Sequence, residues 1–307
     1  GESFTCPSRA KSKPLKIFYY QAPQGNFGDD LNGWLWEELA PGRWSGDEST
    51  LFCGIGTIIG NSLPTAAPRI RVFSSGIGYR PVPADFTSTR WDVVALRGPL
   101  TAQIVGRPDR ALADGALLLS TLPRLTPIET AARHDVIFVP HYEAISEGDW
   151  EGACARAGVT LVDPRQCAHR VIEHIRRARL VIADSMHAAI IADTLRVPWL
   201  PVASSPRINS FKWLDWTLSL NLPYDPVTLP AISAEAAYEG HVQRAIIQNY
   251  RLPRPGRDAA LAHYRRLMQR EQNGWWRKVK PKLKHHLMVL PDRLPSIGAA
   301  RRMIGRW

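Results

Sequence analysis

Short apolar runs alternate with helix-like spacings of apolar residues along most of the chain. Runs typical of buried strands occupy residues 15–20, 51–54, 70–75, 92–96, 135–140, 159–162, 180–184 and 197–202. The segments 31–39, 99–106, 152–157, 167–178 and 187–195 have the spacing or the start signals of helices. This alternation favours an α/β fold in which helices cover both faces of a parallel sheet.

The alternation is interrupted by a stretch with several prolines at residues 121–129, and it starts again afterwards. We interpret this stretch as a linker between two parallel-sheet domains. The predicted organisation is an N-terminal extension (1–14), a first domain (15–125), a second domain (130–250) and a C-terminal segment (251–307).

Charge is distributed unevenly between these parts. The chain carries a net charge of +11, but residues 251–307 alone contain 15 Lys and Arg against three acids, so the first 250 residues are nearly neutral. The same segment contains Trp275 and Trp276 beside the basic run 277–284. Aromatic and basic residues together suit an anionic membrane surface, where each basic residue contributes roughly 1 kcal/mol. We predict a basic helical tail that binds such a surface; a disordered tail is the alternative, and nucleic-acid binding is disfavoured.

Two further features bear on the compartment. No apolar run approaches the roughly 18 residues that a membrane-spanning helix needs, and residues 1–13 lack the apolar segment of a secretory signal. The four cysteines, Cys6, Cys53, Cys154 and Cys167, form no CxxC pair, so reduced thiols are expected rather than a zinc site. We therefore expect a cytoplasmic protein, peripheral at the inner face of the cell membrane.

Residues that follow the predicted strands are the candidates for a site, because ligands bind beyond the carboxyl ends of parallel strands. In the first domain these positions hold a polar loop, two glycine turns and a lone arginine. In the second domain they hold two histidines and a serine. The positions are Asn26, Asp29, Asp30, Gly56, Gly76, Arg97, His141, Ser185 and His187. Together they predict an anion-binding cleft between the domains.

Seven segments, taken in order, resemble the polysaccharide pyruvyl transferase family, especially its bacterial exopolysaccharide branch. They are NFGDDLN (26–32), CGIGTIIG (53–60), SSGIG (74–78), LRGPLT (96–101), DGALLL (114–119), VPH (139–141) and DSMHAAIIADTLRVPWLPV (184–202). The resemblance covers about residues 15–220. It implies two Rossmann-like domains facing across a cleft, similar to GT-B glycosyltransferases. It also implies an enzyme that moves the enolpyruvyl group of phosphoenolpyruvate, as a ketal, onto two hydroxyls of a terminal sugar. The expected acceptor is a lipid-linked exopolysaccharide precursor.

This chemistry needs fixed cations for the anionic donor, an acid for the enol carbon and a base for the sugar hydroxyls. His187 and Asp29 are the predicted catalytic residues. An ordinary imidazole pKa near 6.5 lets a histidine act both as an acid and as a base near neutral pH. The predicted donor-binding residues are Arg97, His141, Ser185, Lys212 and the turns at Gly56 and Gly76, and the predicted acceptor-binding residues are Asn26 and Asp30. Helix capping is the alternative for the serine and the aspartates. Asp114 is expected either to orient Arg97 or to close a turn.

The chain departs from the family pattern at one position. Many members have an arginine two residues before the motif histidine, where this chain has Ser185. The segment FKWLDW (211–216) resembles a lysine-bearing motif of the exopolysaccharide branch, so Lys212 is expected to supply the missing charge.

Other functions are compatible with the same fold. A glycosyltransferase that uses a nucleotide sugar is one alternative, and a noncatalytic glycan- or membrane-binding protein is another. No metal and no cofactor are expected, because the remaining histidines show no ligand spacing and phosphoenolpyruvate is itself the donor substrate.

Overall fold

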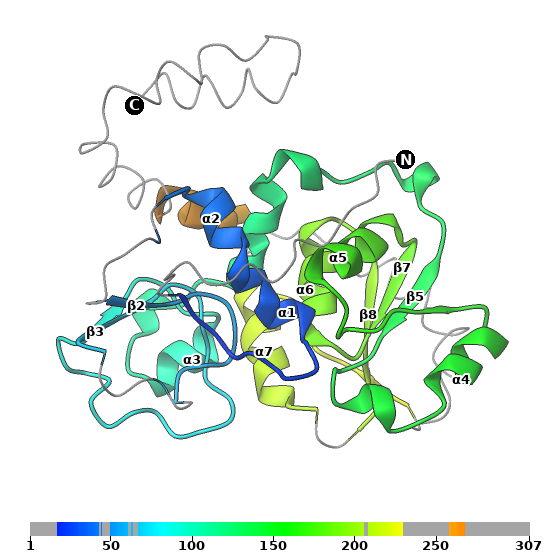
Figure 1. The fold of residues 1–307 in the computed structure, drawn as a ribbon. Helices are drawn as coiled ribbons and strands as arrows, with labels where there is room; N and C mark the ends of the chain where they lie inside the picture. Colours follow the sequence, from blue (N-terminus) through cyan, green and yellow to red (C-terminus); the bar gives the residue numbers. More distant parts are fainter. Residues whose placement is uncertain are drawn as a thin grey trace, which may run out of the picture.

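The computed structural model describes residues 17–42, 44, 50–60, 63, 67–205, 208–229 and 258–267. Within these residues the chain forms two all-parallel sheets, each flanked by helices (Figure 1). The N-terminal sheet has the strand order β1-β2-β3-β4, and the C-terminal sheet has the order β6-β5-β7-β8-β9. The predicted α/β class with two parallel sheets is confirmed.

The strands are short. Those of the N-terminal sheet are β1 (Ile17–Phe18), β2 (Thr50–Cys53), β3 (Arg69–Val72) and β4 (Trp91–Val93). Those of the C-terminal sheet are β5 (Val136–Val139), β6 (Thr160–Leu161), β7 (Leu180–Ala183), β8 (Trp199–Ala203) and β9 (Val227–Thr228). Strands β5 and β7 are buried along their whole length, as expected for central strands covered on both faces.

The helices follow the strands in turn. The α-helices are α1 (Phe27–Asp30), α2 (Leu35–Leu39), α3 (Pro99–Ile104), α4 (Trp150–Arg156), α5 (Ala168–Arg177), α6 (Met186–Thr194) and α7 (Ser210–Ser219). The 3₁₀ turns are η1 (Leu31–Gly33), η2 (Pro108–Arg110), η3 (Gly115–Thr121), η4 (Pro123–Leu125), η5 (Thr130–Ala132) and η6 (Ala144–Ser146). Pro99 occupies the first turn of α3, where its missing N–H costs nothing, as predicted.

Two predicted segments differ from the structure. The helix expected over 31–39 is divided into η1 and α2, because the side chain of Asn32 bonds to the backbone of Ile55 in the loop after β2. The proline-rich stretch 121–129 is not a free linker: it contains η4, and Leu122 and Leu125 are buried in the core.

A continuous core joins the two halves. Helix α6 packs on β7 and β8 of its own sheet and on η3 of the N-terminal half, so all nine of its residues are buried. Helix α7 packs against α3, and α1 packs against α5. In Figure 1, α1, α6 and α7 lie between the two sheets. The loops at the carboxyl ends of both sheets are thereby held against each other.

The prediction that residues 251–307 form a separate tail is wrong for residues 258–267. These residues form a helix that lies beside α2 (Figure 1). Ala260, Leu261, Tyr264 and Leu267 are buried in the core because they recur on one face of the helix. The Tyr264 hydroxyl donates a hydrogen bond to the carbonyl of Ala113. Residues 251–257 and 268–307, including the tryptophans and the basic run, lie outside the described residues.

The cysteines also differ from the prediction. Cys53 and Cys154 are free and buried, as expected from their apolar surroundings. Cys167 is disulfide-bonded, which corrects the expectation of reduced thiols throughout. It lies at the start of α5, outside the apolar runs, so burial does not protect its thiol. No helix in the described part of the chain combines the length and the hydropathy needed to span a bilayer.

Candidate active site

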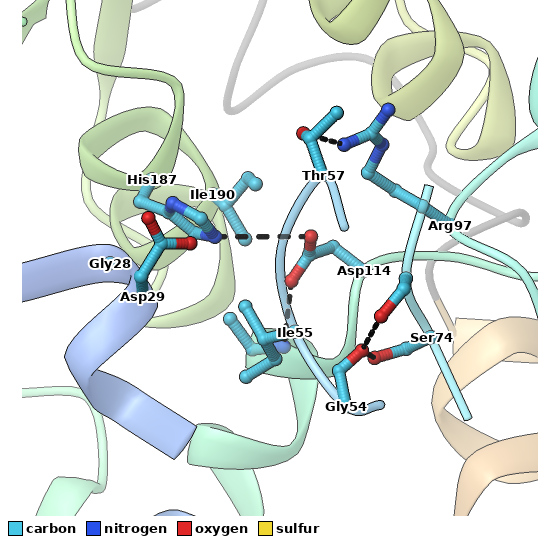
Figure 2. Close-up of polar contacts among 12 residues, drawn as sticks. Gly28, Asp29, Gly54, Ile55, Thr57, Ser74, Arg97, Asp114, His187 and Ile190 are labelled. Atoms are coloured by element: carbon cyan, nitrogen blue, oxygen red, sulfur yellow. Dashed lines mark hydrogen bonds and ion pairs between the residues drawn. The ribbon is translucent and has the colours of Figure 1, made fainter. Parts of the chain in front are cut away.

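The predicted site residues gather where the carboxyl ends of the two sheets meet. Figure 2 shows His187 at the start of α6, beside Gly28 and Asp29 of α1, with Asp114 and Arg97 approaching from loops of the N-terminal half. Thus one half of the molecule supplies the histidine, and the other supplies the carboxylates and the arginine.

Asp29 is held by a network within its own loop. The Asn26 amide donates to the Asp29 carboxylate at 2.7 Å, and the Asn26 amide oxygen accepts from the backbone N–H of Gly28 at 3.3 Å. Asn32, which is fully buried, donates to the carbonyls of Asp29 and Ile55 at 2.9 Å each. Burial raises the pKa of Asp29 to about 7, and the nearby Lys212 ammonium opposes that shift. Asp29 is therefore half-protonated near neutral pH and can both give and take a proton.

His187 packs directly on α1. A Cβ atom at Gly28 would lie 2.1 Å from Nδ1 of the His187 ring, so no larger residue fits at position 28 without moving the ring. Burial lowers the pKa of His187 to about 3, and the charges of Lys212 and Arg97 act in the same direction. The imidazole is neutral at physiological pH in the absence of a bound anion.

The other nitrogen of this ring faces Asp114. His187 Nε2 lies 4.0 Å from Asp114 Oδ2, the contact drawn as a dashed line in Figure 2. Both atoms are buried and have no hydrogen-bond partner. The other carboxylate oxygen of Asp114 accepts from the backbone N–H of Ala116 at 2.9 Å and caps η3. Burial raises the pKa of Asp114 to about 6. Asp114 does not bond to Arg97 here, so of its two predicted roles the structure supports turn closure.

Lys212 enters the site from α7. Its backbone N–H bonds to the cap residue Asn209 at 3.3 Å, and its ammonium donates to the hydroxyl of Tyr79. The stem of Lys212 passes over Gly78, where a Cβ atom would lie 2.9 Å from the lysine Cγ. Burial lowers the pKa of Lys212 to about 8, with Arg97 adding to the shift and Asp29 opposing it. A half-buried cation held beside the exposed Tyr79 suits an anionic ligand.

Arg97 is fully buried and already paired. Its Nε donates to Asp215 of α7 at 3.1 Å, and its terminal nitrogens donate to Thr57 at 2.7 Å and to the carbonyl of Ile77 at 2.9 Å. Asp215 also accepts from the Thr101 hydroxyl at 2.6 Å. Arg97 thus joins the two halves of the molecule and acts on the site through its charge, since none of its side chain is exposed.

The predicted glycine turns fit around protein side chains. Gly56 has a φ of 122°, a conformation that favours glycine, and a Cβ there would lie 3.0 Å from Asp29 Oδ1. A Cβ at Gly76 would lie 2.4 Å from the Arg97 guanidinium. Asp29 and Arg97 are thus the nearest side chains to these glycines, and the ligand contact predicted for the two turns stays a prediction.

His141 and Ser185 lie at the ends of β5 and β7. The His141 ring contacts Tyr142 with centroids 4.7 Å apart, and its Nδ1 lies 3.7 Å from the Glu143 carboxylate. Ser185 occupies the N-cap position of α6, but its side chain makes no capping hydrogen bond. Their position is set by Asp184, a fully buried carboxylate that accepts from the backbone N–H groups of His141 and Ser204 at 3.0 Å.

Asn26 and Asp30 stabilise the turn that carries Asp29. Asn26 caps α1, and its own backbone N–H donates to Asp30 at 3.4 Å. The capping alternative, which was given for the aspartates, describes Asp30 in this structure, and the acceptor contacts predicted for Asn26 and Asp30 stay predictions.

Sequence reasoning missed several residues around the site. Asn32, Asp184 and Asp215 are fully buried polar groups that fix loops far apart in the chain. Tyr20 and Tyr79 are exposed by 45% and 56%, and both follow strands of the N-terminal sheet. Three of these lay within quoted motifs, Asn32 in NFGDDLN, Asp184 at the start of DSMHAAIIADTLRVPWLPV and Asp215 in FKWLDW, but their partners are distant in sequence. Among the residues that the structure describes, no group of three or more His, Cys, Asp or Glu could hold a metal ion.

The chain is similar to several known proteins. A solved structure, described as a functional uncharacterized protein KP1_0663 from Klebsiella pneumoniae subsp. pneumoniae NTUH-K2044, is 13% identical. It covers 70% of this chain and 93% of its own, with a TM-score of 0.41. Residues 65–206 match the family model for polysaccharide pyruvyl transferase.

A much closer likeness is to the succinoglycan biosynthesis protein ExoV of Rhizobium meliloti (strain 1021). The two chains are 40% identical over 228 residues, which covers 74% of this chain and 72% of that protein. The family-model match, residues 65–206, includes Arg97, His141, Ser185 and His187. This chain therefore belongs to the polysaccharide pyruvyl transferase family, and it is a polysaccharide pyruvyltransferase.

Proposed function

We propose that this enzyme transfers the enolpyruvyl group of phosphoenolpyruvate onto two hydroxyls of a terminal sugar in a lipid-linked exopolysaccharide precursor. The proposal rests mainly on one observation: the half-buried Lys212 and Asp29 converge on the buried His187 at the strand ends, and desolvation and mutual charge shift the pKa of each side chain. Perturbed groups that converge at strand ends are typical of catalytic sites.

Lys212 is the residue that holds the donor. Its ammonium is presented by Tyr79 and is surrounded by charges of both signs, with Arg97 behind it. Phosphoenolpyruvate brings a phosphate and a carboxylate, and these anions replace the Tyr79 hydroxyl as partners of the lysine. Arg97 strengthens the positive potential from its buried ion pair but does not touch the donor. His141 and Ser185, at the neighbouring strand ends, complete the donor side.

Proton transfer is assigned to His187 and Asp29. The negative charges of the donor oppose the two cations that lower the pKa of His187, so donor binding favours the imidazolium. The imidazolium protonates the methylene carbon, and the Asp29 carboxylate accepts the proton of the attacking sugar hydroxyl. Cleavage of the C–O bond to phosphate and addition of the second hydroxyl close the ketal. The two hydroxyl protons end on the new methyl group and on the released phosphate, so the reaction is balanced without an oxidant.

The acceptor approaches from the exposed side of the cluster. Tyr20 and Tyr79 present half-exposed rings there, and Tyr142 bonds to Tyr20 and to Glu143. Aromatic rings next to a carboxylate suit a sugar, which offers apolar C–H faces and hydroxyl groups. Asn26 and Asp30 contribute by holding the turn that carries Asp29.

We also infer where in the cell the enzyme works and how its two parallel-sheet halves share the donor. The two parallel-sheet halves act as facing Rossmann-like lobes of a GT-B-like fold, with the donor between them. A lipid-linked acceptor places the reaction at the inner face of the cell membrane. The ExoV relative is named for succinoglycan biosynthesis, which makes a bacterial exopolysaccharide the expected product pathway.

The direct test is phosphate release from phosphoenolpyruvate in the presence of a lipid-linked oligosaccharide fraction. We expect release that depends on the acceptor, together with acid-labile pyruvate on the recovered glycan. Turnover of a nucleotide sugar by the same preparation, with phosphoenolpyruvate untouched, would contradict the proposal.

A further inference from the structure

The contact between Asp114 and His187 has no role in the reaction as described so far. Both facing atoms, Asp114 Oδ2 and His187 Nε2, are buried and lack a hydrogen-bond partner, although they lie only 4.0 Å apart. A buried polar atom without a partner is costly, and about 90% or more of such atoms are satisfied in folded proteins. Two unsatisfied atoms that face each other next to a catalytic cluster therefore need an explanation.

The two nitrogens of the His187 ring have different environments. Nε2 is buried, so the 10% of the side chain that remains exposed belongs to its other atoms. Nδ1 is the nitrogen next to Gly28, on the side of α1 and Asp29. The Nδ1 side of the ring therefore faces Asp29, the predicted catalytic carboxylate, whereas Nε2 faces Asp114 (Figure 2).

The charges around the ring favour one arrangement of its proton. The ring is influenced by Lys212 and Arg97, and Asp29 belongs to the adjacent turn. Asp114 is the carboxylate that faces Nε2, and its Oδ2 has no other partner. An ionised carboxylate attracts an N–H group and repels a bare nitrogen lone pair.

We propose that Asp114 is a positioning residue that holds His187 in the tautomer protonated at Nε2, so that Nδ1 is the atom that exchanges a proton with the substrate. When the donor binds and the ring becomes an imidazolium, the 4.0 Å gap closes into a charge-assisted hydrogen bond. The catalytic use of Nδ1 rests on the function proposed above; the tautomer itself does not.

The fold allows a clean test of this role. In Asp114→Asn, the amide oxygen still accepts the N–H of Ala116, so the cap of η3 is kept. The amide NH₂ then faces Nε2 and donates to it, which forces the proton to Nδ1. Asp149 is a matched control, because its Oδ1 caps α4 by accepting from Gly152 at the same 2.9 Å, at the exposed surface.

The experiment is nitrogen NMR of histidine-labelled full-length protein, with His187→Ala used to identify the His187 signals. In the wild type without donor, we expect a protonated Nε2 and an unprotonated Nδ1. In Asp114→Asn we expect the opposite tautomer, with the proton on Nδ1. Asp149→Asn should show the wild-type tautomer. A wild-type ring protonated at Nδ1 would overturn the proposal without requiring any variant to fold. An unchanged tautomer in folded Asp114→Asn would overturn it as well.

Kinetics then separate the tautomer from its catalytic use. Asp114→Asn is expected to reduce kcat about 10²-fold or more with little change in the KM for phosphoenolpyruvate, since a general acid contributes about 10²–10⁴-fold. A rise in the KM for phosphoenolpyruvate of about the same factor, with kcat unchanged, would refute the positioning role. If no preparation turned over phosphoenolpyruvate, the proposed function would fail while the NMR result still decided the tautomer.

Discussion

At the scale of single residues, the site depends on charges that burial has moved away from their ordinary pKa values. Asp29 is raised to about 7 and Lys212 is lowered to about 8, in both cases chiefly because the protein removes water from the charged form. Each group is therefore close to its own titration point at neutral pH, and its function should depend on pH in a predictable direction.

Lys212→Met should weaken donor binding. Loss of a charge-assisted contact of about 1.5–3 kcal/mol raises the KM for phosphoenolpyruvate roughly tenfold to a hundredfold. In the wild type the ammonium is present below pH 8 and is lost above it, so KM should rise as the pH increases through about 8. Initial rates across a pH series measure both effects. Arg170→Met, which removes an exposed cation of α5, is the control and should leave KM unchanged.

Asp29→Asn should reduce kcat rather than binding. The variant keeps an oxygen for the Asn26 amide but no longer accepts a proton, so kcat should fall about 10²–10⁴-fold. Because Asp29 becomes an ionised base as the pH rises, the wild-type kcat should increase through about pH 7, and this limb should vanish in the variant. Asp30→Asn, one residue further along α1, should stay within a few-fold of wild type. Equal losses in both variants would argue against Asp29 as the base.

The sequence indicates where such residues lie but not what surrounds them. Asp29, Arg97 and His187 could be found because they follow strands, and position after a strand is readable from the pattern. That Arg97 would be fully buried against Asp215 could not be predicted, because the two residues are 118 positions apart. The shifts in pKa likewise depend on burial that only the packed fold creates.

At the scale of elements, the glycines of the strand-end loops make room for the site. The alternating pattern correctly predicted most strands and helices, since burial on both faces leaves a continuous apolar signature. It did not predict the division of the 31–39 helix, because Asn32 bonds to Ile55, 23 residues away. The glycine turns were recognised, but the pattern did not predict their close contacts with Asp29 and Arg97.

Gly28→Ala tests this packing. The added methyl group would lie 2.1 Å from the His187 ring, so the ring or α1 must move. We expect a loss of about 1–3 kcal/mol in the free energy of unfolding and a lower kcat. Gly33→Ala is the comparison, because its added methyl group meets only the Tyr19 hydroxyl at 3.3 Å. Denaturant unfolding and initial rates measure the two effects; wild-type values for Gly28→Ala would mean that the His187 ring is not held by α1.

At the scale of the whole molecule, the two sheets form one packed body around the site. Helix α6, the contact of α7 with α3, and the helix at 258–267 all connect parts that the sequence assigned to separate units. Such contacts between distant segments leave no periodic signal. The buried Arg97–Asp215 pair is the polar part of the same junction, and the histidine and lysine of one half depend on it for their place opposite the other.

Asp215→Ala should therefore be strongly destabilising. It leaves the buried Arg97 without its counter-charge, at an expected cost of about 3–5 kcal/mol. The double variant Arg97→Met/Asp215→Leu should lose less than the sum of the single variants, as coupled residues do. Asp163→Asn, which breaks the partly exposed pair with Arg165, should cost less than about 1 kcal/mol. Additive losses in the double variant would show that the pair does not join the halves.

The most direct test of the whole account is the transfer reaction run in deuterium oxide with phosphoenolpyruvate and a lipid-linked oligosaccharide fraction. The account predicts a glycan-bound ketal whose methyl group carries one deuterium, with one phosphate released for each ketal, and loss of both products in His187→Ala. A ketal formed at the wild-type rate by His187→Ala, or a methyl group without deuterium, would contradict the assignment of proton transfer to this site.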